Sequence, residues 1–254
     1  MRKSRKRIRS IKTIIYTILS IILLSALFSF IFFTNVFSVK EIVVVNNAKV
    51  DSETIINNSN INIGTSNLFL VDTTQVCDSI KKIPYIENAV VSKKFPNKIE
   101  ISVTERASSY VIKVNEEYYS IDINGTILEK IENVDETQNV IIVLSPDLDV
   151  SKGVLDEANI NKLKNIEITN QVAKSNGVND LITRFDMSND SNIIIDIASE
   201  GKRVFLGNFV DDMSLNVKFF WLKTIMEQEK GKVGIIYLNV DLNKNKVVFR
   251  EQNF

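Results

Sequence analysis

The chain has 254 residues with 31 basic and 31 acidic side chains, so its formal net charge at pH 7 is zero. Seven of the cations lie within the first twelve positions, which leaves an acidic remainder of 24 basic against 31 acidic residues, a net charge of about −7. This balance argues against a nucleic-acid-binding protein, because such proteins present a basic face to the phosphates. Histidine is absent and Cys77 is the only cysteine. An internal disulfide is therefore excluded, and the commonest zinc ligand and general base are missing.

A long uncharged segment follows the basic N-terminus. Residues 14–33 carry no charged side chain, and as a helix they reach about 30 Å, the thickness of a bilayer's hydrocarbon core. A cleaved signal peptide would have a shorter apolar core followed by small residues, whereas this segment ends in phenylalanines. We therefore expect a transmembrane helix at 14–33. The basic tail at 1–13 predicts that the N-terminus is cytoplasmic and that the remaining residues lie outside.

The segment after the span predicts a small α/β module. A β-branched run is followed by two short helical stretches, the second beginning at Asp72 and ending before Pro84. Two strands follow, and the second alternates apolar with polar residues, which predicts one buried and one solvated face. The expected elements are a strand at 39–45, helices at 51–58 and 72–83, and strands at 86–94 and 98–105 joined by a hairpin turn at 95–97.

The remaining residues predict mostly short strands with two longer helices. Asn124-Gly125 is a strong tight-turn signal, and the final hairpin is expected to turn at 242–245. The expected strands are 110–114, 118–122, 126–131, 140–144, 181–187, 192–198, 203–207, 233–240 and 246–250, with helices at 156–175 and 212–230. In the last helix the apolar stripe is expected to contain Leu215, Phe219, Leu222 and Met226, widened by Phe220 and Trp221.

Two acidic motifs favour structural roles over metal binding. Asp186, Ser188, Asp190 and Asn192 are spaced like the start of a calcium loop, but the required glycine and closing glutamate are missing, so a solvated turn is expected. Asp211-Asp212 is expected to cap a helix N-terminus. We expect no catalytic, cofactor or metal site in the chain.

Several short motifs, in their order along the chain, resemble the FtsQ/DivIB family of bacterial cell-division proteins. The family's pattern P-x-I-x-x-A-x-V-x-R-x-x-P is similar to residues 84–96, with Lys93 in place of arginine, and its V-x-E-R ending is similar to residues 103–106. SIDINGTIL and RVFLG resemble later family motifs. The resemblance implies an α+β fold: a POTRA domain (β-α-α-β-β) at 37–106, then a mostly antiparallel β-rich domain at 107–254 with a long helix near the C-terminus.

Two positions depart from the family pattern. A glycine usual after the first strand is Asn47 here, which can also adopt a left-handed backbone. Near the C-terminus, where the family often has aromatic-x-D-x-R, this chain has Asn239 and Asp241 at the charged places. Any ion-pair role of that motif is therefore not carried over.

The resemblance implies a non-enzymatic scaffold of the septum, held in the cell membrane by a single span. Its implied partners are the small single-span septal proteins FtsL and FtsB/DivIC, with the septal peptidoglycan synthase as a further candidate. We expect docking by strand addition on the final hairpin and the preceding helix. The candidate contact residues are Tyr237, Val247, Val248, Phe249 and Arg250, with Lys218 at the rim.

Other interpretations remain open from the sequence. Val247, Phe249 and Tyr237 could be inward-facing strand residues without any role in docking. The chain could also be a wall-binding or export-assisting POTRA module unrelated to division. An unrecognised wall hydrolase would need a carboxylate pair or metal site, and the sequence offers neither.

Overall fold

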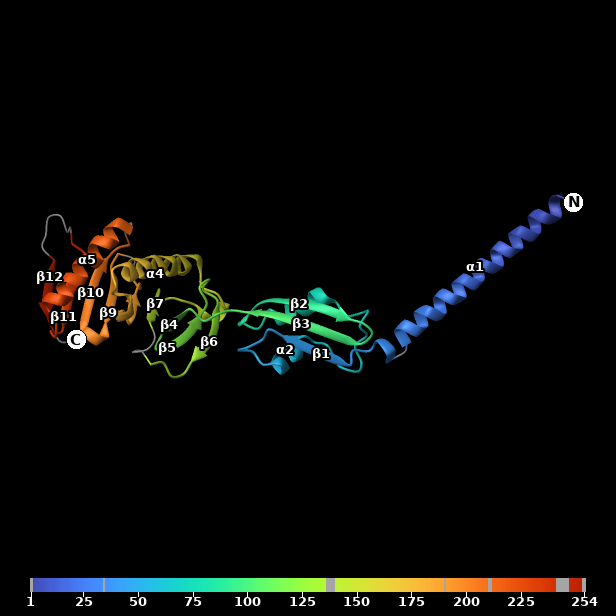
Figure 1. Ribbon diagram of the computed structural model, residues 1–254, viewed down its shortest axis with the longest axis horizontal. Helices are drawn as coiled ribbons and strands as arrows, with labels where there is room; N and C mark the ends of the chain where they lie inside the picture. The colour runs from blue at the N-terminus through green and yellow to red at the C-terminus, as the bar shows by residue number, and fades with distance from the viewer. Residues whose placement is uncertain are drawn as a thin grey trace. The chain divides into compact units, whose positions relative to one another are not determined.

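The computed structural model describes residues 2–33, 35–135, 140–189, 191–209, 212–240 and 247–252. Two compact units make up the chain, Met1–Arg106 and Ala107–Phe254. The first contains a long helix and a three-stranded sheet, and the second contains a nine-stranded sheet with two long helices (Figure 1). This α+β architecture confirms the expected fold class.

The N-terminal helix α1 (Arg2–Phe33) is the apolar helix that the sequence predicts. Within it, Lys12–Ile31 is long and apolar enough to cross a membrane, and the rest of the chain buries none of this stretch. Two of its hydroxyls bond back to the preceding turn, Thr17 to the Thr13 carbonyl and Ser25 to the Ile22 carbonyl. Such bonds satisfy the hydroxyl protons without water.

After α1, the elements of the first unit follow the predicted chain order of strand, helix, helix, strand, strand. Asp51 and Asp72 cap the two helices by accepting from backbone N–H groups of their first turns. Strand β1 pairs in parallel with β3, and β2 pairs antiparallel with β3, so β3 is central. The elements are β1 (Glu41–Val45), α2 (Ser52–Asn58), α3 (Thr73–Ile80), β2 (Ile86–Lys94) and β3 (Lys98–Glu105).

The loop after β1 is held by a carboxylate from the end of β3. Glu105 accepts hydrogen bonds from the backbone N–H groups of Ala48, Lys49 and Val50, at 3.1, 2.8 and 2.9 Å. Burial acts to raise the pKa of the Glu105 carboxyl, but the three N–H groups together outweigh burial and lower it. The glutamate of the V-x-E-R motif therefore acts as a clamp: its carboxylate holds the backbone of residues 48–50 against the end of β3.

One expectation for this loop was wrong. The left-handed residue after β1 is Asn46, with φ 66°, rather than Asn47. Asn47 instead donates its side-chain amide to the Val50 carbonyl, at 2.8 Å. β1 ends at Val45, as the sequence predicts, and the left-handed Asn46 follows it directly.

We expect Glu105→Gln to loosen this loop by about 2 kcal/mol, because a neutral amide offers one acceptor oxygen to three N–H donors. The folded-state pKa of Glu105 is lowered, so its contribution is present above the ordinary glutamate value of 4.5 and is lost as the pH falls through the folded value. Hydrogen exchange of the 48–50 amides against pH measures both effects. Equal protection and an equal acid response in the two proteins would contradict the clamp.

The second unit is built on one nine-stranded sheet with the strand order β12-β11-β10-β9-β8-β7-β4-β5-β6. Five of its strand pairings are antiparallel, and the pairs β4–β7, β7–β8 and β10–β11 are parallel. The elements are β4 (Tyr110–Val114), β5 (Glu117–Ile121), β6 (Ile127–Ile131), β7 (Ile141–Val143), α4 (Glu157–Ser175), β8 (Arg184–Asp186), β9 (Ile193–Ile197), β10 (Lys202–Gly207), α5 (Asp212–Gln228), β11 (Gly234–Tyr237) and β12 (Val248–Glu251).

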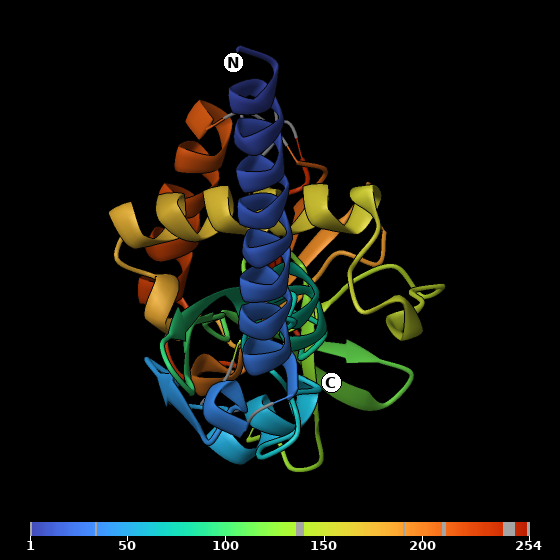
Figure 2. The same ribbon diagram turned by 90° about the vertical axis from the view of Figure 1, so that its right-hand side faces the viewer.

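Helices α4 and α5 share one hydrophobic core with a single face of this sheet. Cross-strand partners lie on the same face, and one row of partners runs through Ile236, Val204, Ile195 and Phe185, all of which are fully buried. The helices cross (Figure 2), and Asn176, the residue after α4, donates its side-chain amide to the side chain of Asn216 in α5. The opposite sheet face carries the alternate residues of each strand.

The predicted stripe of α5 is confirmed in part. Leu215, Phe219, Leu222 and Met226 are buried in the core. Phe220 and Trp221 do not widen this stripe: both are exposed and contact each other edge to face, with centroids 6.0 Å apart. Each residue turns the helix by about 100°, which carries the two rings off the sheet-facing side. Asp190, Asp211 and the predicted turn at 242–245 lie outside the described residues.

Candidate protein-docking edge

Strand β12 forms one edge of the nine-stranded sheet and β6 the other. Near its start, β6 is partly covered, because Ile127 donates to the Gly153 carbonyl and Thr126 forms a bridge with Val154. In the part of the chain that the structure describes, β12 has a strand partner only on its β11 side. An edge strand of this kind presents backbone groups that a further strand can pair with.

The direction of the β12 backbone groups follows from the pairing of β11. Gly234 and Leu238 donate their N–H groups to carbonyls on the β10 side, so Ile235 and Tyr237, which alternate with them, direct theirs toward β12. The Gln252 N–H also bonds to the Val233 carbonyl, which fits this alternation because Val233 lies two residues before Ile235. The residues that bond to β11 are therefore Val248 and Arg250. Phe249 and Glu251 direct their N–H and C=O groups to the free edge.

The helix-free face beside this edge carries an aromatic and cationic group. Tyr237, which pairs with Val248, stacks on Phe205 with ring centroids 5.3 Å apart and planes 8° from parallel. The Arg250 guanidinium lies 5.8 Å from the centre of the Tyr237 ring. Val248 is 46% exposed beside them. Tyrosine and arginine are among the residues enriched at surfaces that anchor a protein partner.

Phe249 of β12 and Val247, which precedes the strand, face the core. Val247 and Phe249 are half-buried and pack against the hydrophobic cluster of this unit. Phe249 pairs with Ile236, which is fully buried. The inward-facing interpretation therefore applies to Val247 and Phe249, while Tyr237 lies on the opposite face.

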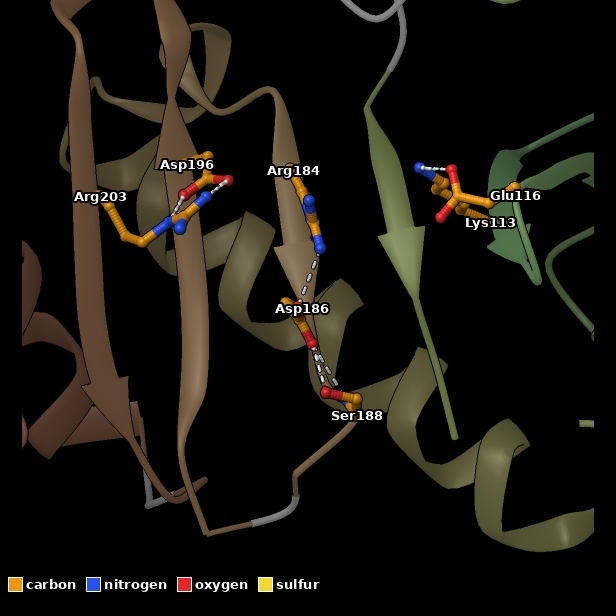
Figure 3. Close-up of polar contacts among 7 residues, drawn as sticks. All are labelled: Lys113, Glu116, Arg184, Asp186, Ser188, Asp196 and Arg203. Atoms are coloured by element: carbon orange, nitrogen blue, oxygen red, sulfur yellow. Dashed lines mark hydrogen bonds and ion pairs between the residues drawn. The ribbon is translucent and has the colours of Figure 1, made fainter. Parts of the chain in front are cut away.

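Two ion pairs lie on the same helix-free face further along the sheet, one between neighbouring strands and one within a single strand (Figure 3). Arg203 binds Asp196 on the neighbouring strand with two bonds of 2.7 and 2.8 Å, and Arg184 binds Asp186 at 2.9 Å. Asp186 also accepts from the backbone and hydroxyl of Ser188, at 3.1 and 2.6 Å. The Asp186 carboxylate is thus engaged by a turn and an arginine. Among the described residues, no three acidic or cysteine side chains form a group that could hold a metal ion.

Comparisons with known proteins identify the family. Residues 37–106 match the family model described as "POTRA domain, FtsQ-type". The cell division protein DivIB of Clostridium tetani is 31% identical, over 91% of this chain and 86% of that protein. The chain belongs to the DivIB/FtsQ family. DivIB of Clostridium botulinum strain Loch Maree is 28% identical over 99% of this chain and 95% of its own length. FtsQ of Syntrophotalea carbinolica is 27% identical over 86% of this chain and 76% of its own length.

In this DivIB/FtsQ-family chain, Lys218 does not lie at an exposed rim. Its side chain is only 8% exposed, and its Nζ atom donates to the Leu206 carbonyl at 2.6 Å. Burial lowers the pKa of the Lys218 ammonium. The aliphatic part of the lysine lies in the core, and its ammonium binds a carbonyl at the end of β10. Lys218 therefore stabilises β10 and makes no contact at the exposed edge.

The structure adds two residues that the sequence analysis missed. Phe205 is one, because it supports Tyr237, and the alternation of buried and half-buried residues in β10 could have placed it on the same face as Arg203. Gly234 is the other. A Cβ atom there would lie 2.7 Å from the Phe249 ring and still closer to the Arg250 carbonyl, so the glycine permits the close approach of β12. A glycine at the start of a strand is the signal that could have found it.

We expect Gly234→Ala to displace β12 in this DivIB/FtsQ-family protein and to cost about 1–3 kcal/mol of the free energy of unfolding. Gly234 does not have a positive φ, so the whole effect is steric. Urea denaturation followed through Trp221, the only tryptophan, measures the change in the second unit. An unchanged unfolding midpoint would show that the edge tolerates a methyl group here and would contradict the packing argument.

Proposed function

We propose that the chain is a non-enzymatic, single-span division scaffold that binds the ectodomains of FtsL-like and FtsB/DivIC-like septal proteins. By holding them it would help to regulate septal peptidoglycan synthesis, with the septal synthase as a further candidate partner. The observation that carries the proposal is the β12 edge. Phe249 and Glu251 direct backbone groups outward there, and Val248, Tyr237 and Arg250 flank them.

Strand addition suits this edge on physical grounds. Main-chain hydrogen bonds give affinity to an added strand, and side chains on the two faces give specificity. On one face a partner strand would meet Val248 and the Tyr237 ring, and on the other it would meet Phe249. Lys218, which is buried, enters the proposal as a support for β10 rather than as a contact.

The expected topology supports a role at the outer surface of the membrane. The seven cations before the span favour a cytoplasmic N-terminus, and the POTRA domain and the second unit would then lie outside, where septal wall is made. The relatives are named cell division proteins, which supports a division role for this chain.

Imaging tests the proposal most directly. A fluorescent protein fused to the N-terminus is expected to give a mid-cell band in dividing cells before constriction begins. A fusion lacking the second unit serves as the control, because it keeps α1 and the POTRA domain but loses the β12 edge. Uniform membrane fluorescence from a functional full-length fusion would overturn the division role and favour a wall-binding or export-assisting POTRA module.

A further inference from the structure

One end of the three-stranded sheet gathers exposed apolar side chains. The hairpin between β2 and β3 carries Phe95, which is 58% exposed, and Phe69 and Leu70 of the loop before α3 are also exposed. The ring of Phe69 lies 5.1 Å from that of Phe95 and 4.9 Å from that of Phe37, measured between centroids. The three rings therefore form one connected cluster, and the exposed Leu70 directly follows Phe69 in the sequence. Exposed apolar clusters of this kind mark interaction sites with proteins or membranes.

Helix α1 ends close to this end of the sheet. Helix α1 ends at Phe33, and Ser38 already forms a bridge with Asn67, so only residues 34–37 separate the helix from the folded domain. Four or five residues span at most about 17 Å. Contacts shorten the gap further: Asn67 donates its side-chain amide to the Ile31 carbonyl at 2.9 Å, and the Phe30 and Phe37 rings lie 6.4 Å apart.

The cations at this end suit lipid headgroups. The Lys40 N–H bonds to the Asn97 carbonyl, which places Lys40 beside the hairpin, and Lys93 donates its ammonium to the Phe69 carbonyl at 3.3 Å. Lys94 and Lys98 also lie here, paired with Glu100 and Glu41. Aromatic rings next to lysines are typical of a membrane interface, where the rings lie at the depth of the headgroups and the cations meet the phosphates.

We propose that Phe69, Leu70 and Phe95 insert into the headgroup layer of the membrane that α1 crosses. The POTRA domain then rests on the outer leaflet, beside the end of α1. The inference depends on α1 spanning the membrane, as proposed above, and adds a second, peripheral contact between the same chain and the same lipid surface.

A fluorescent label at Phe95 tests the contact in the full-length protein. The only cysteine is first removed by Cys77→Ser, and Phe95→Cys or Val90→Cys is then labelled with an environment-sensitive dye. Val90 is a matched control because it is also apolar and exposed, at 55%, but lies five residues back along β2, about 17 Å away. Both proteins are reconstituted into phosphatidylethanolamine and phosphatidylglycerol vesicles containing lipids brominated near the top of the acyl chain.

The bromines are expected to quench the label at position 95 severalfold more than the label at position 90. Adding Phe69→Asp and Leu70→Asp is expected to remove this difference, since both side chains are exposed and a carboxylate at either position opposes burial in lipid. Equal, weak quenching at the two positions in protein that floats with the vesicles would overturn the contact while leaving the anchor intact. Protein that does not float with the vesicles would overturn both the anchor and the contact.

Discussion

Glu251→Pro is expected to weaken the proposed binding of FtsL-like and FtsB/DivIC-like ectodomains by more than about tenfold while leaving the fold intact. The Glu251 N–H points to the free edge of β12, so proline removes a donor that an added strand would use and leaves the bonds to β11 in place. Losing a main-chain bond costs about 0.5–1.5 kcal/mol, and the proline ring also obstructs the incoming strand. Co-purification of full-length proteins in detergent, followed by titration, measures the change.

Glu251→Ala is the matched control, because it removes the same exposed carboxylate and keeps the N–H donor. Its capture of partners is expected to stay within about twofold of the unmodified chain, since a single exposed charge contributes less than about 1 kcal/mol. If the proline and alanine variants bind equally well, strand addition at β12 is excluded. If both lose binding to the same extent, the carboxylate rather than the backbone carries recognition.

Phe219→Ala is expected to lower the free energy of unfolding of the second unit by about 3–5 kcal/mol, because the ring is fully buried between α5 and the sheet. A loss of this size is a large share of the stability of an ordinary domain. Urea denaturation followed by Trp221 fluorescence reports on this unit alone, since the first unit contains no tryptophan.

The adjacent Phe220 provides the control on the same helix. Its ring is 61% exposed, and its described ring contact is with Trp221, so Phe220→Ala is expected to cost less than about 1 kcal/mol. Comparable losses for the two variants would show that the exposed side of α5 is also packed against something in solution.

The elements of the first unit could be predicted closely because local signals agreed. Alternation through Ile99, Ile101 and Val103 indicates a half-buried strand, and the helices predicted to begin at 51 and 72 are capped by the aspartates at those positions. Residues 95–97 form the turn between β2 and β3. Each of these features depends on residues within a few positions of one another.

The docking edge could be predicted only as a region, because its details depend on the register of distant strands. Alternation shows that Val248 and Phe249 lie on opposite faces, but which of them meets the core follows from the pairing of β11 with β10 and β12. The same holds for the outward N–H of Glu251. The expected rim position of Lys218 is wrong because the Leu206 carbonyl that binds its ammonium belongs to another element, and this contact depends on how α5 packs against β10.

The parallel pairing of β1 with β3 also sets an order of events during synthesis. Glu41 pairs with Lys98, so about 57 further residues must be synthesised before β1 can pair with β3. At a translation rate of about 5–20 residues per second, that delay is roughly 3–11 s. Over this interval Ile42, Val43 and Val44 form an unpaired β-branched segment, the kind that associates with other nascent chains. A factor that shields extended strands as they emerge would therefore raise the yield of folded POTRA domain more than one that acts on the completed chain.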